Sequence, residues 1–168
     1  EIIEADRGDE DRLVALARDV DGILTCFALT TANVIKASPK LKVVSRYGIG
    51  VDNIDVDVAT ELGIPVSYVP DYCVEEVADH AMALLLSLTR QVGQAIKDGP
   101  RSWENRVQYR QVEVELSGMT MGIVGFGGTG RALAQRAAGF DMKIRAVDRD
   151  AVEGTPEAPL VQTLTGLP

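Results

Sequence analysis

Residues 119–148 read MTMGIVGFGGTGRALAQRAAGFDMKIRAVD. The apolar run before Gly125 predicts a buried strand, and the stretch after Gly130 predicts an amphipathic helix. A second apolar run ends at Asp148 and predicts another strand. The glycines follow the spacing Gly-x-Gly-x-x-Gly, with Gly127 in the middle. Strand, glycine turn, helix, strand and acid in this order are typical of a dinucleotide-binding βαβ unit.

Each part of this unit meets a physical need of a bound dinucleotide. Gly125 permits the tight turn, Gly127 lets the backbone approach a pyrophosphate, and Gly130 lets helix and strand pack closely. The pyrophosphate then meets the N–H groups and positive dipole end of the helix that starts near Gly128. Asp148 lies 18 residues after Gly130, where a carboxylate accepts both ribose hydroxyls and repels a 2′-phosphate. The sequence therefore predicts NAD as the cofactor.

Several residues around the turn leave alternatives open. Arg149 follows the acid and could contact the adenosine part of the cofactor, hold the 2′-phosphate of NADP, or lie on the surface as a solvated arginine. Phe126 and Thr129 complete the predicted cofactor-binding segment, and Gly128 adds flexibility inside it. The simpler alternative is that the glycines only make a tight turn in an α/β protein.

Composition bounds the class of protein. The chain has 168 residues, 46% of them hydrophobic, and a net charge of −8. This charge argues against a nucleic-acid partner, and no apolar run reaches the ~20 residues of a membrane span. No signal-peptide pattern opens the chain. Cys26 and Cys73 lack metal-ligand spacing, so we expect buried thiols, no metal site and a cytoplasmic location.

Before the glycine turn, strands and helices alternate in the way that builds a parallel sheet. Helices are expected at 9–19, from Thr31 to Pro39, from Asp55 to Gly63 and over 74–94, and strands at 23–27, 41–45 and 64–69. Residues 95–118 look like a connection or protruding arm, in which Trp103 could anchor a subunit contact or pack on its own chain.

Two further motifs carry a resemblance. With RYGIGVDNID at 46–55, a long helix and the glycine turn in this order, the chain resembles the D-isomer-specific 2-hydroxyacid dehydrogenases. The segment VPDYCVEEVADHA at 69–81 is similar to the branch of C-terminal-binding proteins and phosphoglycerate dehydrogenases. The resemblance covers roughly residues 10–150. It implies a doubly wound Rossmann nucleotide-binding domain, here 91–168, a flavodoxin-like substrate domain, here 1–90, and a homodimer.

The first of these motifs predicts an anion site. Alternating glycines after a strand expose successive backbone N–H groups, and Arg46 is placed to add a charged bond to a carboxylate. The resemblance implies that the backbone at 47–49 grips the carboxylate of a 2-hydroxy or 2-oxo acid, and that Ile49 approaches the nicotinamide. A glycine-bearing loop closed by an Asp55 helix cap is a compatible alternative. The predicted substrate-binding residues are Arg46, Tyr47, Gly48, Ile49 and Gly50.

The start of the long helix supplies one further predicted contact. The resemblance makes Val77 a contact on the nicotinamide side, while core packing is the alternative. Glu75, Glu76 and Asp79 are interpreted as favourable charges at the amino end of a helix. His80 is the only histidine, but its mid-helix position predicts a structural role.

No catalytic residue is predicted within this chain. In the family, the catalytic histidine, arginine and glutamate lie beyond the point that corresponds to Asp148, and no motif here matches them. We therefore expect a chain that is incomplete at both ends, with about ninety residues missing between Glu157 and Thr163, since a doubly wound half needs two or three more βα units. Residues 159–162 give only a weak strand signal.

The predicted function is NAD-dependent hydride transfer between nicotinamide and a D-2-hydroxy acid or 2-oxo acid. A histidine outside this chain would move the proton, and closure of the two domains would exclude water. The alternative is an NAD(H)-responsive binding protein of the corepressor type without significant turnover.

Overall fold

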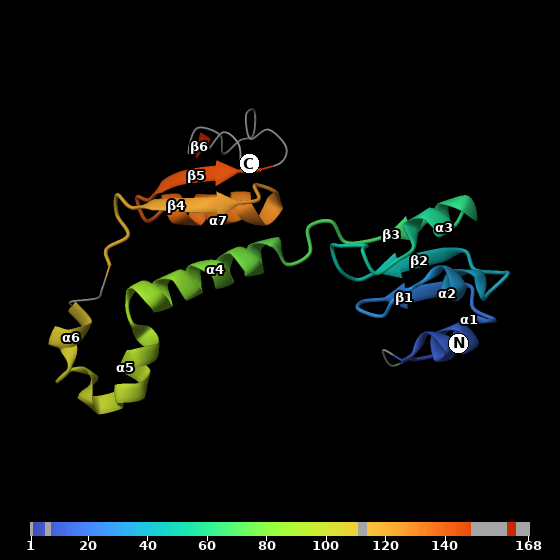
Figure 1. Ribbon diagram of the computed structural model, residues 1–168, viewed down its shortest axis with the longest axis horizontal. Coiled ribbons are helices and arrows are strands. Elements are labelled where there is room, and N and C mark those ends of the chain that lie inside the picture. Colours follow the sequence, from blue (N-terminus) through green and yellow to red (C-terminus); the bar gives the residue numbers. More distant parts are fainter. Residues whose placement is uncertain (1, 6–7, 111–113, 149–160, 164–168) are drawn as a thin grey trace. The chain divides into compact units, whose positions relative to one another are not determined.

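The computed structural model describes residues 2–5, 8–110, 114–148 and 161–163. The chain forms two compact units, Glu1–Tyr72 and Cys73–Pro168 (Figure 1). Each unit contains a three-stranded sheet whose strands all pair in parallel. The structure thus confirms the α/β class with parallel sheets.

The first unit places three strands beside three helices, in the order α1 (Glu10–Ala17), β1 (Gly22–Thr25), α2 (Ala32–Lys36), β2 (Val43–Arg46), α3 (Val56–Glu61) and β3 (Val66–Ser67). The sheet order is β1-β2-β3. Its core consists of Ile35, Leu41, Val44, Ile54 and Ala59. Connections of this kind bring the carboxyl ends of all three strands to one edge of the sheet.

Short polar side chains start the helices of this unit. The side chains of Asp9, Thr31 and Asp55 accept the N–H groups of Arg12, Val34 and Val58, respectively. Each of these bonds satisfies a donor that the first turn of a helix leaves without an intrahelical partner. The expected helix starts at these three residues are therefore confirmed.

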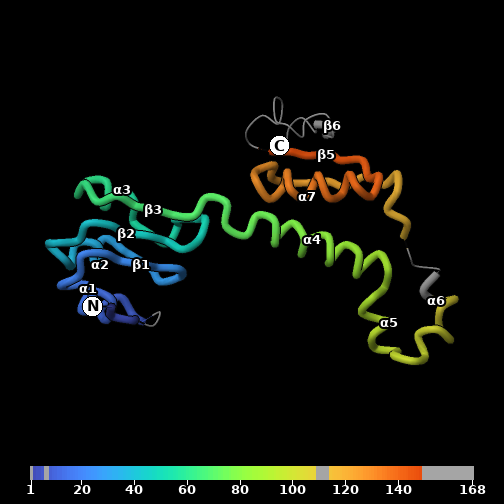
Figure 2. The backbone as a smooth tube through the Cα atoms, turned by 180° about the vertical axis from the view of Figure 1, so that it is seen from behind, coloured from blue at the N-terminus to red at the C-terminus, as the bar shows by residue number. Residues whose placement is uncertain are grey.

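The second unit contains α4 (Val74–Thr89), α5 (Val92–Asp98), the 3-10 helix η1 (Gly99–Ser102), α6 (Arg106–Arg110), β4 (Thr120–Val124), α7 (Gly128–Ala138), β5 (Lys143–Val147) and β6 (Val161–Thr163). Its sheet order is β4-β5-β6. Helix α7 runs along β4 and β5, as Figure 1 and Figure 2 both show. The core between them includes Ile123, Phe126, Ala134, Ala137 and Ile144, and Met82 of α4 joins it.

The prediction of one helix over 74–94 is wrong at its carboxyl end. Helix α4 ends at Thr89, and Gln91 adopts a left-handed conformation with φ 53° before α5 begins. The Gln91 side chain donates to the carbonyl of Leu88 at 2.9 Å, which satisfies one of the last carbonyls of α4. Because apolar residues continue on both sides of this break, the hydrophobic periodicity of the sequence does not reveal it. The expected arm at 95–118 is partly helical, since it contains the end of α5, η1 and α6.

The domain division after residue 90 stays a prediction. It would place α4 with the substrate domain, whereas in the structure α4 packs on α7 within the second unit. The strand signal at 159–162 is confirmed in part by β6, which pairs in parallel with β5. Most of the suspected gap at 157–163 lies outside the described residues. No helix among the described residues is both long and apolar enough to cross a membrane.

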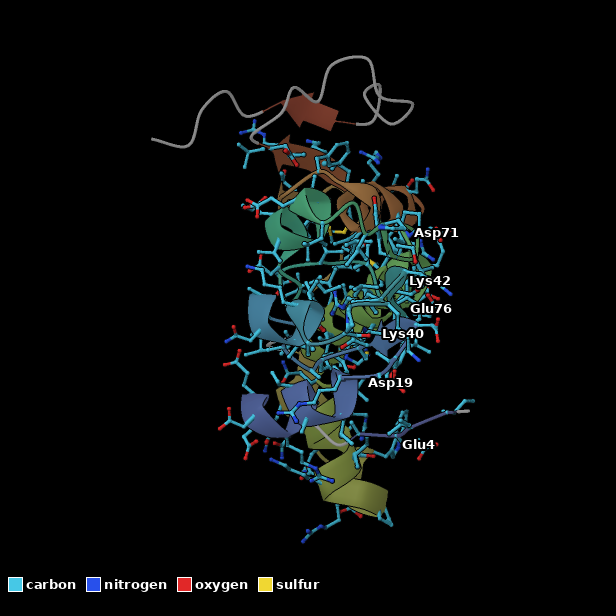
Figure 3. All side chains as sticks on the ribbon, turned by 90° about the vertical axis from the view of Figure 1, so that its right-hand side faces the viewer. Glu4, Asp19, Lys40, Lys42, Asp71 and Glu76 are labelled. Atoms are coloured by element: carbon cyan, nitrogen blue, oxygen red, sulfur yellow. The ribbon has the colours of Figure 1, made fainter. Side chains whose placement is uncertain are left out.

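Exposed ion pairs lie on the surface of the first unit. Lys40 Nζ lies 2.7 Å from Asp19 Oδ1 (both labelled in Figure 3), and Lys42 Nζ lies 2.8 Å from Asp21 Oδ1. The bond to Asp19 raises the pKa of Lys40, and the bond from Lys42 lowers the pKa of Asp21. Because these pairs face solvent, salt screens them, and we assign them no functional role.

Candidate functional site

The glycine turn joins β4 to α7 in the geometry that its spacing predicts. Gly125 has φ +93°, a conformation that L side chains rarely adopt. Its N–H donates to the carbonyl of Val147 at 2.8 Å, which ties the turn to the neighbouring strand β5. A Cβ on Gly130 would collide with the carbonyl oxygen of Gly125. The close packing of helix on strand therefore requires glycine at position 130.

The outer side of the turn is open. A Cβ built on Gly125 or Gly127 would meet no described heavy atom within 4 Å. Gly127 is the N-cap of α7, and no side chain caps it. The first N–H groups of α7 thus face room that a phosphate group could fill, and the positive end of the helix dipole favours such an anion. The residues at the turn fit a pyrophosphate.

Asp148 is bonded directly to the turn. Its Oδ2 accepts the backbone N–H of Phe126, whose side chain is 3% exposed and belongs to the core. Arg131 Nη1 donates to the carbonyl of the same Phe126 at 2.9 Å. The end of β5 and the first turns of α7 therefore hold Phe126 from both sides. Arg149, the other predicted residue at this end of β5, lies outside the described residues.

Two further turn residues have distinct surroundings. A Cβ on Gly128 would lie 3.4 Å from Val74 Cγ2, so the first turn of α4 packs against the first residue of α7. Thr129 is half-buried in the first turn of α7.

The predicted substrate loop follows β2 in the first unit, and Arg46 braces it. Arg46 Nε donates to the carbonyl of Cys26 at 2.9 Å, and Nη1 donates to the carbonyl of Gly50. These bonds hold the loop against the end of β1. The guanidinium is therefore used partly for structure, and Nη2 donates to no acceptor among the described residues.

Some backbone N–H groups of this loop are hydrogen-bonded to carbonyls, and others are not. Tyr47 N–H donates to the carbonyl of Thr25 at 3.2 Å and continues the sheet pattern. Within the described residues, the N–H groups of Gly48, Ile49 and Gly50 donate to no carbonyl. Ile49 is 48% exposed. The N–H groups of Gly48, Ile49 and Gly50 are thus available to an anion, whereas the Tyr47 N–H is already bonded to Thr25.

Asn53 was not predicted as a separate loop residue. Its Nδ2 donates to the carbonyls of Ala28 at 2.8 Å and Cys26 at 3.3 Å, so it joins this loop to the one after β1. Its Oδ1 is buried and accepts no bond from a described residue. The sequence carries one signal for this role, an amide side chain in the loop between β2 and α3, where it can bond to neighbouring backbone.

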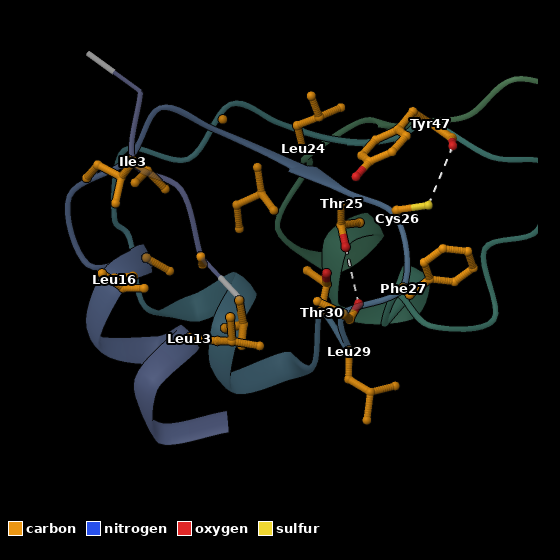
Figure 4. A pocket seen from close by; sticks show the side chains of 17 residues that line it. Ile3, Leu13, Leu16, Leu24, Thr25, Cys26, Phe27, Leu29, Thr30 and Tyr47 are labelled. Carbon is orange, nitrogen blue, oxygen red and sulfur yellow. Dashed lines mark hydrogen bonds between the residues drawn. The ribbon is translucent and has the colours of Figure 1, made fainter. Parts of the chain in front are cut away.

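A cavity of about 260 Å³ lies beside β1 in the same unit (Figure 4). Leu13 and Leu16 of α1 line one side, and Leu24 and Phe27 line another. Tyr47 reaches it from the loop, where the Cys26 thiol donates to the Tyr47 carbonyl at 3.8 Å. Its described lining contains no charged side chain. The cavity shares Tyr47 with the predicted substrate loop but is not lined by Gly48, Ile49 or Gly50.

The first turns of α4 carry the remaining predicted residues. Val77 is 50% exposed, so it is available for a ligand contact and is not a core residue. His80 is exposed on the same helix. Glu75 and Asp79 do more than complement the helix dipole, because both bind Arg136 of α7. Sequence reasoning missed this contact.

Comparison with known proteins identifies the family. Residues 1–161 match the family described as D-isomer specific 2-hydroxyacid dehydrogenase, catalytic domain. The chain is 38% identical over 149 residues to D-3-phosphoglycerate dehydrogenase of Mycobacterium tuberculosis H37Rv, covering 88% of this chain and 28% of that protein. It is 39% identical over 144 residues to hydroxypyruvate reductase of Thermotoga maritima, covering 83% and 45%. The chain thus spans less than half the length of these relatives.

A solved structure agrees with the sequence matches. NAD-dependent formate dehydrogenase from Staphylococcus aureus, in complex with NAD, superposes with a TM-score of 0.78 at 29% identity, covering 98% of this chain and 49% of that one. The family match extends over both units; the glycine turn lies between β4 and α7, and the 46–55 segment runs from the end of β2 to α3. The chain therefore belongs to the D-isomer-specific 2-hydroxyacid dehydrogenase family.

Proposed function

We propose that the chain supplies the cofactor-binding and carboxylate-binding parts of an NAD-dependent oxidoreductase. The reaction transfers a hydride between nicotinamide and C2 of a D-2-hydroxy acid or 2-oxo acid. The observation that carries this proposal is the open glycine turn at 125–130, bonded through Phe126 to Asp148. The NAD complex of the related formate dehydrogenase supports the same cofactor here.

In this proposal the turn residues bind the pyrophosphate through the N–H groups at the start of α7. Asp148 accepts the ribose hydroxyls and repels a 2′-phosphate, which favours NAD over NADP. Ile49 and Val77 contact the nicotinamide side, and Arg149 contacts the adenosine side. The exposure of Ile49 and Val77, 48% and 50%, supports these contacts.

The substrate carboxylate would be held by the N–H groups of Gly48, Ile49 and Gly50, with Arg46 beside them. Aligned N–H donors stabilise an anion without reorganising during the reaction. These residues bind and orient the acid. The bound nicotinamide supplies the hydride chemistry, and the proton-transferring histidine, with its arginine and glutamate, is proposed to lie outside these 168 residues.

A homodimer in the cytoplasm is part of the proposal. Large apolar side chains are exposed along and after α4, at Leu88, Ile96, Trp103 and Val107. Apolar surface of this kind is suited to a contact with a second copy of the chain.

The corepressor-type alternative gains no support from the relatives described above, which are all named as enzymes. Their names include a phosphoglycerate dehydrogenase and a hydroxypyruvate reductase. Small 2-hydroxy or 2-oxo acids are therefore the substrate class to test.

Titration with NADH and NADPH tests the proposal. We expect the chain to bind NADH more tightly than NADPH. Asp148→Asn keeps an oxygen acceptor for the Phe126 N–H but removes the charge, so the preference for NADH should fall about tenfold, as expected for losing about 1.4 kcal/mol of discrimination. Asp148→Ala removes the acceptor as well and should weaken both cofactors. Unchanged affinities for both cofactors in Asp148→Asn would contradict the ribose assignment.

A further inference from the structure

Arg136 of α7 has all three guanidinium nitrogens engaged. Its Nη2 lies 2.7 Å from Glu75 Oε2, and its Nε lies 2.5 Å from Asp79 Oδ1. Its Nη1 donates to the carbonyl of Ala132 at 3.0 Å, within its own helix. The Arg136 side chain is 24% exposed, whereas the two carboxylates are about 70% exposed. A guanidinium held at three nitrogens has one orientation, and the two carboxylates must meet it there.

Both carboxylates lie on the first turns of α4. They are four residues apart and therefore share one face of the helix. The N-cap position of α4 is Cys73, which has φ 58° and makes no side-chain cap bond. The amino end of α4 thus lacks the support that Asp9, Thr31 and Asp55 give to other helices. The bonds to Arg136 supply support from a neighbouring helix instead.

The supported turn touches the proposed cofactor site. Val74 precedes Glu75, and its Cγ2 would be 3.4 Å from a Cβ on Gly128. The helix pair α4 and α7 also shares core packing through Met82 and Ala134. Met82 lies further along α4 than Glu75 and Asp79, and Ala134 lies between Gly128 and Arg136 on α7. At the end of α4 near the glycine turn, Arg136 is the described side chain that joins the two helices by charge.

We propose that Arg136 is a positioning residue for the dinucleotide. By holding Glu75 and Asp79, it keeps Val74 against Gly128 and fixes the turn of α4 that carries Val77. Arg136 itself does not touch the cofactor. This inference rests on the proposed function, namely that the glycine turn binds NAD.

The hydrogen bonds to the two carboxylates also favour the charged form of the Arg136 guanidinium. The bond to Glu75, and next the bond to Asp79, raise the pKa of Arg136. The guanidinium is therefore charged at neutral pH, where the cofactor titrations are made.

The test compares two ways of breaking the contact. Arg136→Met removes the cation, and the double variant Glu75→Gln, Asp79→Asn removes both anions at exposed positions. Each should weaken NADH and ADP-ribose binding about three- to thirtyfold, the range for residues that act on a site without touching the ligand. Adenosine, which lacks the pyrophosphate, should bind with unchanged affinity. Combining all three substitutions should add little, because they break one interaction.

Controls separate positioning from general stability and net charge. Lys143→Met removes a cation at the opposite end of β5 from the turn and should leave NADH affinity unchanged. Arg136→Lys should recover part of the affinity. Without cofactor, exchange should speed up in the broken variants for two bonded amides, Val77, which donates to the Cys73 carbonyl at 3.0 Å, and Arg131, which donates to the Gly127 carbonyl at 3.0 Å.

Each outcome decides between explanations. Wild-type affinity and amide exchange in folded Glu75→Gln, Asp79→Asn would overturn the positioning role while leaving the proposed function intact. Equal losses for adenosine and ADP-ribose would also overturn it, because the effect would not be located at the pyrophosphate turn. Failure of the wild-type chain to bind NADH would instead overturn the proposed function, and this inference with it.

Discussion

At the scale of single residues, Gly130 carries the strictest requirement of the molecule. A side chain there meets the backbone of Gly125, which cannot move without opening the turn. We expect Gly130→Ala to lower the free energy of unfolding by about 1–3 kcal/mol, as overpacking does, and to abolish NADH binding. Urea denaturation and an NADH titration measure the two effects.

The matched control is Gly93→Ala on α5. A Cβ at that position meets nothing within 4 Å, so the substitution should leave stability unchanged or raise it slightly, because alanine favours helix. Equal behaviour of Gly130→Ala and Gly93→Ala would mean that the close approach at residue 130 is not required.

Among single residues, the glycines of the turn were predictable from the sequence, whereas the partners of Arg136 were not. The spacing of Gly125, Gly127 and Gly130 predicted the turn, because these glycines answer local backbone needs. The partners of Arg136 lie 57 and 61 positions away in the chain. No local pattern marks such a pair, since it exists only after α4 and α7 have packed. Likewise, the bracing role of Arg46 depends on carbonyls that the fold brings to it.

At the scale of elements, helix starts were predictable and one helix end was not. Asp55 marks the start of α3 because its side chain satisfies a free N–H group, which is a local interaction. The break after α4 contains neither glycine nor proline. It depends on Gln91 adopting a left-handed conformation, which only the surrounding structure fixes.

The cap of α3 gives a prediction at this scale. Asp55→Ala removes the bond to Val58 N–H at 3.1 Å and should cost about 1 kcal/mol of stability. Native-state hydrogen exchange of the Val44 amide, which donates to Pro65 at 3.1 Å, reports on this unit. Asp57→Ala, in the first turn of the same helix but without a cap bond, is the control. Equal exchange in both variants would contradict the capping role.

At the scale of the whole molecule, the two units have separate cores. Ile35 is 0% exposed in the first core, and Ile144 is 1% exposed in the second. Ile35→Ala and Ile144→Ala should each cost about 2–5 kcal/mol, the usual range for such truncations in a core. Each should accelerate amide exchange in its own sheet and leave the other sheet protected. Acceleration in both sheets by either variant would show that the units unfold together.

The bond between Asp148 and the N–H of Phe126 has a consequence for redesign. An acid at the end of the second strand favours NAD over NADP, so its replacement is the direct way to change the proposed cofactor preference. Here the same carboxylate also accepts the Phe126 N–H of the turn that we propose binds the pyrophosphate. A basic or small residue at position 148 would change the proposed selectivity for NAD over NADP. It would also remove the acceptor that holds the Phe126 N–H. A successful switch to NADP in this scaffold needs a second substitution that restores an acceptor for that N–H.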